Sequence, residues 1–140
     1  MHTDTLIKIL RDYIRDGELS STTFFEGWNS DDWAALMELS TKQGVSAIVY
    51  NTIISKIDNE KIPLKIKLNW ALQSEKIENR VKTQNTQANE IASIWAKHGI
   101  RTVVLKGLGL GRYYPTAWIR ECGDFDCFLF DDYQKGIDIA

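Results

Sequence analysis

The sequence predicts an α+β fold, in which a helical region up to about Gly99 is followed by the start of a mixed β-sheet domain. Two observations predict this fold. Before Gly99, apolar residues recur at the three- and four-residue spacing of amphipathic helices. After Gly99, short runs of β-branched and aromatic residues alternate with glycine-containing turns. We therefore expect a helical region over residues 1–99 and the N-terminal part of an α/β domain over residues 100–140.

The composition is that of a soluble globular protein, with 140 residues that are 44% hydrophobic and 26% charged. A net charge of -2 argues against bulk nucleic-acid binding through phosphate neutralisation. No apolar run reaches the roughly 18–20 residues of a membrane span, and residues 1–5 do not resemble a secretory signal. We expect a cytoplasmic protein with no membrane contact, in which Cys122 and Cys127 are reduced thiols.

The first two predicted helices are amphipathic and have recognisable ends. Residues 3–16 carry apolar side chains at helical spacing, and Gly17 is a plausible C-terminal stop. A turn-rich segment follows. Ser30 then stands before two aspartates, as an N-cap followed by acidic residues in the first turn, where the helix dipole favours them. This second helix is expected to continue to about Gln43, and Gly44 breaks it.

Two further helices complete the helical region. Residues 45–57 show a helical apolar stripe, although Val, Ile and Thr are dense enough there that a strand is the alternative. A long helix is expected from Pro63 to Gly99. Gln73 and Gln84 fall on its apolar seam, which disfavours an extended homodimeric coiled coil. The long helix is therefore expected to pack inside its own domain.

The second part of the sequence places two carboxylates together. Residues 101–105 predict a strand, residues 108–114 a short helix and residues 125–130 another strand. Because side chains alternate along a strand, Asp124 and Asp126 are expected on one face. Paired carboxylates suit Mg²⁺, which takes its remaining ligands from water and substrate phosphates. The sequence thus predicts a magnesium site at these two residues, with a nucleotide phosphate as the third component.

This second part also resembles a known family. The order of its motifs is similar to the signature of an uncharacterised nucleotidyltransferase-like family within the DNA polymerase β-like nucleotidyltransferase superfamily: Leu105-Lys106-Gly107, Tyr113-Tyr114-Pro115, Arg120 and Gly123-Asp124-Phe125-Asp126. The helical region resembles the N-terminal region of the same family. The resemblance implies a nucleotidyltransferase-type sheet and metal-dependent transfer of a nucleoside monophosphate from an NTP to an acceptor.

The resemblance also implies roles for individual residues. Asp124 and Asp126 would be the catalytic carboxylates that hold Mg²⁺. The nucleotide would be bound by Lys106, Gly107, Gly109 and Arg120. Two alternatives stay open, because Lys106 can instead shield a sheet edge and Arg120 can instead form a structural ion pair. The sequence does not identify the acceptor, which can be a protein side chain, a small molecule or an RNA end.

Two features depart from the superfamily pattern. Leu108 stands where a Gly or Ser usually follows the motif glycine, and Gly109 and Gly111 are expected to allow the close backbone approach instead. The superfamily also takes a third carboxylate from a later strand, and Asp131, Asp132 and Asp138 lie too soon after the second strand to replace it. We therefore expect the chain to be the N-terminal portion of a longer protein, with a truncated sheet, that is catalytically incomplete alone.

Other functions remain as alternatives. A non-catalytic nucleotide-binding or protein-interaction module fits a missing third carboxylate. A glycosyltransferase also uses an Asp-x-Asp pair, but there the apolar strand precedes the acids, whereas here residues 127–130 follow them. Tyr113, Tyr114 and Trp118 can stack on a base, but Tyr114 and Pro115 are expected to pack the turn instead, and Trp118 to fill a core gap. His2 and His98 lack partners at zinc-site spacing.

Overall fold

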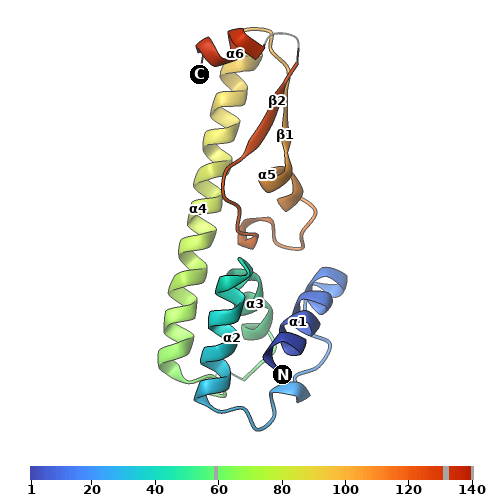
Figure 1. Cartoon of the computed structure of the whole chain (residues 1–140), viewed down its shortest axis with the longest axis vertical. Helices are drawn as coiled ribbons and strands as arrows, with labels where there is room; N and C mark the ends of the chain where they lie inside the picture. The colour runs from blue at the N-terminus through green and yellow to red at the C-terminus, as the bar shows by residue number, and fades with distance from the viewer. Residues whose placement is uncertain (59, 131–132, 140) are drawn as a thin grey trace.

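The computed structural model describes residues 1–58, 60–130 and 133–139. Figure 1 shows an elongated molecule in which the long helix α4 (Leu64–Lys97) extends along nearly the whole length. Three shorter helices lie along the half that contains the N-terminus, and a pair of antiparallel strands lies along the other half. None of the helices within the described ranges is both long and apolar enough to cross a membrane. The other elements are α1 (His2–Asp16), η1 (Thr23–Phe25), α2 (Ser30–Lys42), α3 (Ser46–Ile54), β1 (Thr102–Leu105), α5 (Lys106–Gly111), η2 (Ala117–Ile119), β2 (Asp126–Leu129) and α6 (Tyr133–Ile139).

The ends of α1 and α2 follow from local backbone chemistry. Gly17 ends α1 in the left-handed conformation, at a φ of 77°, as the sequence predicts. The N-cap of α2 is Asn29 and not Ser30, so that prediction is wrong by one residue. Asn29 accepts hydrogen bonds from the backbone N–H groups of Asp31 and Asp32, and the Asp32 carboxylate accepts one from the Asn29 N–H. This reciprocal capping box places Ser30 inside the first helical turn.

Residues 46–54 form helix α3, so the strand alternative is wrong. The high density of β-branched residues has a different cause, because α3 packs against α1, α2 and α4 and is buried on several sides. Val49 and Ile53 are fully buried. The hydroxyl of Thr52 donates to the carbonyl of Ile48 at 2.7 Å, which satisfies a polar group inside this core.

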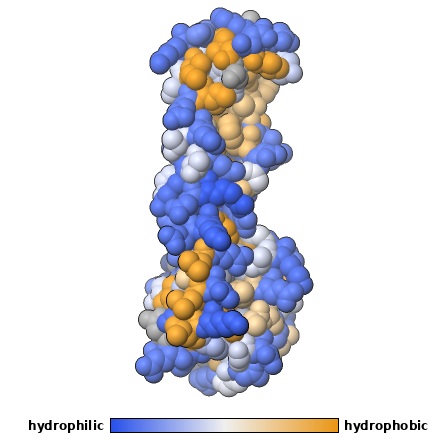
Figure 2. All heavy atoms as spheres, turned by 90° about the vertical axis from the view of Figure 1, so that its left-hand side faces the viewer, coloured by the Kyte–Doolittle hydropathy of each residue, from blue (hydrophilic) through white to orange (hydrophobic). Residues whose placement is uncertain are grey.

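Helix α4 packs within its own chain, as its sequence predicts. Its buried residues include Trp70, Ile77 and Val81. The amide of Gln73 donates to the Thr41 hydroxyl of α2 at 3.0 Å, and that of Gln84 donates to a backbone carbonyl in the second half of the chain. Figure 2, viewed from the α4 side, shows a hydrophilic surface around the middle of the molecule, with hydrophobic patches toward both ends. The two glutamines therefore bind α4 to its own fold.

Strands β1 and β2 form an antiparallel pair, so the described residues confirm the α+β class. Val104 lies opposite Cys127, and Leu105 lies opposite Asp126. Both strands are shorter than expected, and β2 begins at Asp126. On the outer face of the pair, Val103 and Phe128 are about half exposed. The strand pair lies beside α4 in Figure 1, and the motif residues Leu105 and Asp126 lie opposite each other at one end of it. The border proposed near Gly99 remains a prediction, because α4 contacts elements on both sides of it.

Candidate nucleotide and metal site

The Leu105-Lys106-Gly107 motif forms a sharp turn at the end of β1. Lys106 and Gly107 both have positive φ values, of 38° and 23°. This conformation is uncommon for a residue with a side chain and costs about 1–3 kcal/mol. Gly107 is non-helical (ψ -107°), so the regular part of α5 begins only after it. The regular part of the helix expected over residues 108–114 therefore starts where predicted, but the helix ends earlier, at Gly111. A strained turn between two motif residues is a feature often found at functional sites.

The two halves of the motif are in contact across this turn. A Cβ atom on Gly107 would lie 3.3 Å from the carbonyl oxygen of Asp124 and 3.7 Å from the Cβ of Cys122. Glycine at this position therefore serves both the positive φ and the close approach of the Asp124 segment. Residues that are well separated in sequence are thus held side by side.

Asp124 and Asp126 both expose their side chains to solvent. Asp126 is the first residue of β2 and its side chain is 55% exposed. Asp124 lies in a bend before the strand, so the expectation that both carboxylates belong to the strand is wrong. Their position on one face stays a prediction. The strand begins later than predicted because pairing with β1 ends at Leu105, opposite Asp126. The roles of the two carboxylates as metal ligands remain a prediction.

Lys106 forms an ion pair with the second carboxylate. Its Nζ lies 3.3 Å from Oδ2 of Asp126, and its side chain is 77% exposed. An ion pair this exposed contributes about 0–1 kcal/mol to stability. It therefore leaves both charged groups available for other partners, and contact of Lys106 with a phosphate stays a prediction.

Arg120 is engaged in a structural contact that differs from the expected ion pair with an acid. Its Nη1 donates to the carbonyl of Gly107 at 3.1 Å. Its guanidinium also lies over the Tyr114 ring, with Cζ 5.6 Å from the ring centroid. Arg120 therefore binds the backbone of the strained turn, and a contact with the triphosphate stays a prediction.

Gly109 allows α5 to pack directly against the end of β1. A Cβ atom on Gly109 would lie 2.8 Å from the carbonyl oxygen of Val104, which is closer than real Cβ contacts. The packing against β1 is thus sufficient to explain a glycine here. This contact does not test the predicted role of Gly109 in nucleotide binding, which stays a prediction.

Gly109→Ala is expected to destabilise the fold. The methyl group meets backbone rather than a flexible side chain, so the steric cost should exceed the helix-propensity gain and leave a net loss of about 1–2 kcal/mol. Urea unfolding followed by circular dichroism measures it. Gly123→Ala is the matched control, because a Cβ there meets nothing within 4 Å and should change stability by less than about 0.5 kcal/mol. Equal stability of the two variants would contradict the close approach.

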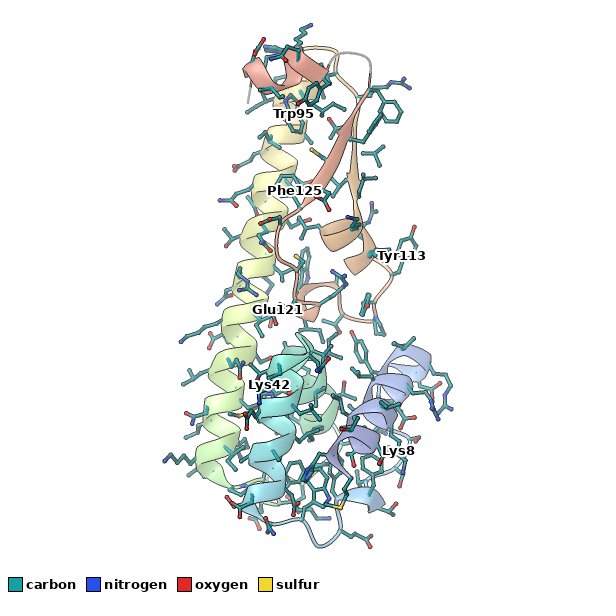
Figure 3. All side chains as sticks on the ribbon, viewed as in Figure 1. Lys8, Lys42, Trp95, Tyr113, Glu121 and Phe125 are labelled. Carbon is teal, nitrogen blue, oxygen red and sulfur yellow. The ribbon has the colours of Figure 1, made fainter. Side chains whose placement is uncertain are left out.

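The aromatic residues of the motif region divide between packing and exposure. Tyr114 packs against the buried cluster that contains Tyr13, as expected. Pro115 lies against Gly17. Trp118 is 38% exposed and borders a cavity of only about 40 Å³, so it does not fill the core as expected. Tyr113 is 85% exposed and points away from the molecule in Figure 3.

Sequence reasoning overlooked a set of polar contacts between α4 and the segment before Asp124. Arg80 forms an ion pair with Glu121, which Figure 3 labels beside the middle of α4. The thiol of Cys122 donates to Oε1 of Gln84 at 3.2 Å. Burial raises the pKa of this thiol, so it keeps the proton that it donates. Both cysteines are free thiols, as predicted. The sequence signal for these polar contacts was Gln84, a polar residue on the apolar seam of α4.

A third carboxylate beside the pair is not found in residues 1–58, 60–130 and 133–139, where no cluster of three or more His, Cys, Asp or Glu side chains is suited to a metal. Asp138 lies on α6 and accepts a hydrogen bond from Gln134. Asp131 and Asp132 lie outside the described residues. His2 pairs with Asp32, far from the motif. Any metal here would be held by two protein carboxylates and completed by water and phosphate, as Mg²⁺ commonly is.

Comparison with known families gives a match for this chain. A family model described as an uncharacterised nucleotidyltransferase matches residues 29–136, which is more than half of the chain. The chain belongs to this family. No curated protein and no solved structure shows significant similarity to it.

The match to the uncharacterised nucleotidyltransferase family includes both halves of the motif and most of the helical region. It supports a nucleotidyltransferase-type function and a nucleotide as substrate. The glycosyltransferase alternative receives no such support. The family description specifies neither the metal nor the acceptor.

Proposed function

We propose that this chain provides the NTP- and metal-binding elements of a nucleotidyltransferase that transfers a nucleoside monophosphate to an acceptor. The observation that carries the proposal is the contact between the two motif halves. Gly107 lies against the backbone of Asp124, and the Lys106 ammonium lies 3.3 Å from the Asp126 carboxylate. The ammonium of Lys106, the glycine turn, the carboxylate of Asp126 and the backbone of Asp124 therefore lie close to one another. Groups of these kinds bind a magnesium-bound triphosphate.

The two carboxylates suit a divalent cation. Asp124 and Asp126 supply hard oxygen ligands, and both are exposed, so neither needs to leave a buried environment. When bound, the metal would supply Lewis-acid stabilisation of the charge that develops on the transferring phosphoryl group. The protein's own contribution is to hold the carboxylates on a bend and a paired strand end, where β1 fixes the position of Asp126.

Lys106 connects the carboxylates with the phosphates. Its ammonium neutralises Asp126, and a divalent cation bound there would compete with it for the same carboxylate. Because the lysine side chain is long and mostly exposed, its Nζ can then turn toward a phosphate oxygen. In this proposal Lys106 holds the carboxylate before the nucleotide arrives and binds the nucleotide afterwards.

Calorimetric titration of ATP, GTP, CTP and UTP into the chain, with Mg²⁺ or with EDTA, tests the proposal. We expect at least one nucleotide to bind with Mg²⁺ and to lose most of its affinity with EDTA. Binding that is equal in the two buffers would contradict a metal-dependent site at these residues. A nucleotide that binds with Mg²⁺ also reveals the base preference.

A non-catalytic nucleotide-binding module is the second candidate. It is favoured by the lack of a third carboxylate beside the pair within the described ranges. Release of pyrophosphate from the bound NTP, measured with a coupled assay, separates the two candidates. Turnover supports the transferase, and metal-dependent binding without turnover in the presence of protein, small-molecule and RNA acceptors supports the module.

A further inference from the structure

The side-chain amide of Gln84 connects α4 to the segment that precedes Asp124. Its Nε2 donates to the carbonyl oxygen of Gly123 at 2.6 Å. Its Oε1 accepts from the Cys122 thiol at 3.2 Å. Both ends of one amide are therefore used on the two consecutive residues that come directly before Asp124.

Gly123 is the point at which this segment needs such support. Gly123 is exposed, and a Cβ atom there would meet nothing within 4 Å, so the space beside its Cα is open. Glycine also has the greatest backbone freedom of all residues. A short hydrogen bond to its carbonyl restricts the peptide unit that connects Gly123 to Asp124. The position of the Asp124 carboxylate is thus coupled to α4 through Gln84.

Other contacts also hold the segment around Asp124 in place. Arg80, four residues before Gln84 on α4, forms its ion pair with Glu121. Gly107 approaches the Asp124 carbonyl oxygen, and Leu105 pairs with Asp126 in the sheet. The Arg80–Glu121 pair is partly exposed and contributes little by itself. Of the contacts that α4 makes with this segment, those of the Gln84 amide lie closest to Asp124 along the chain.

We propose that Gln84 is a positioning residue of the nucleotidyltransferase site, which sets Asp124 relative to Asp126 for metal and nucleotide binding. The inference rests on the proposed function, because it needs Asp124 to be a ligand. It goes beyond that function because it assigns a role in the site to a helix residue outside the motif. Groups that orient metal ligands typically change metal affinity about 10–100-fold when they are removed.

Gln84→Met tests the proposal, with Gln73→Met as the matched control. Both substitutions keep side-chain length and helix propensity on α4, and each removes one amide that connects the helix to another part of the chain. Similar small losses of stability are expected from both. Below the melting transition, the affinity for Mg²⁺ with the tightest-binding NTP should fall about tenfold or more in Gln84→Met only. Equal affinity in both variants would overturn the proposal.

A second readout separates this inference from the proposed function. Amide hydrogen exchange over residues 120–126, measured without nucleotide, should become faster in Gln84→Met and stay unchanged in Gln73→Met. Unchanged exchange in Gln84→Met would overturn the positioning role, even if Asp124→Asn loses nucleotide affinity and so upholds the site. A different result would overturn the assignment of Asp124, and the positioning role with it. In that result, exchange is faster in Gln84→Met, but nucleotide affinity is normal in both Gln84→Met and Asp124→Asn.

Discussion

Asp124→Ala and Asp126→Ala are each expected to remove Mg²⁺-dependent nucleotide binding, by more than about 100-fold, while the fold remains intact. The size of the effect follows because loss of a direct ligand should exceed the 10–100-fold effect of a group that only orients one. The fold should tolerate the changes because both side chains are exposed. The ion pair between Asp126 and Lys106 is also too exposed to contribute more than about 1 kcal/mol. Calorimetry and circular dichroism on the same samples measure the two quantities.

Asp138→Ala is the control for these variants. It removes the same charge from an exposed aspartate in the same half of the molecule, where the carboxylate contacts Gln134 on α6. Its nucleotide affinity should equal that of the unchanged chain, so a general loss of negative charge cannot explain the result. Normal affinity in both Asp124→Ala and Asp126→Ala would contradict the site, and a large loss of helicity would show that the carboxylates are structural.

The helical half could be predicted because local patterns determine its elements. The bounds of α1 follow from apolar spacing and from Gly17, which adopts the left-handed conformation that favours glycine. The long helix α4 follows from a seam that is sustained over many turns. The ambiguity at α3 arose because β-branched residues predict a strand by propensity, whereas here burial between three helices favours them.

The candidate site could be predicted only in part. The order of the motifs identified the residues that meet, and the Lys106 turn and Asp126 do lie together. The start of β2 depends on where pairing with β1 ends, which strand alternation within one segment does not specify. The role of Gln84 depends on a hydrogen bond across 39 positions, and helix α6 depends on Trp95, whose Nε1 donates to the Gly136 carbonyl. Contacts of this range are not encoded in local periodicity.

Trp70→Ala is expected to destabilise the chain by about 3–5 kcal/mol, as is usual for a large buried aromatic. Trp70 is fully buried on α4, and its Nε1 donates to both the carbonyl and the hydroxyl of Ser46 on α3. The variant creates a cavity and leaves buried acceptors with one donor fewer, which adds to the cost. A domain of this size typically has only about 5–15 kcal/mol of stability. Urea unfolding followed by circular dichroism measures the loss.

The same variant tests whether the two halves of the chain unfold together. Because α4 contacts α3 in one half and β1 in the other, we expect one cooperative transition that shifts as a whole. Tryptophan fluorescence and circular dichroism should then report coincident midpoints. Trp70→Phe is the control, since it keeps most of the ring volume and removes only the N–H donor, so it should lose clearly less stability. Two separate unfolding transitions, only one of which shifts in Trp70→Ala, would instead support a border near Gly99 between independently folding parts. The motif residues would then keep their structure when the helical core unfolds.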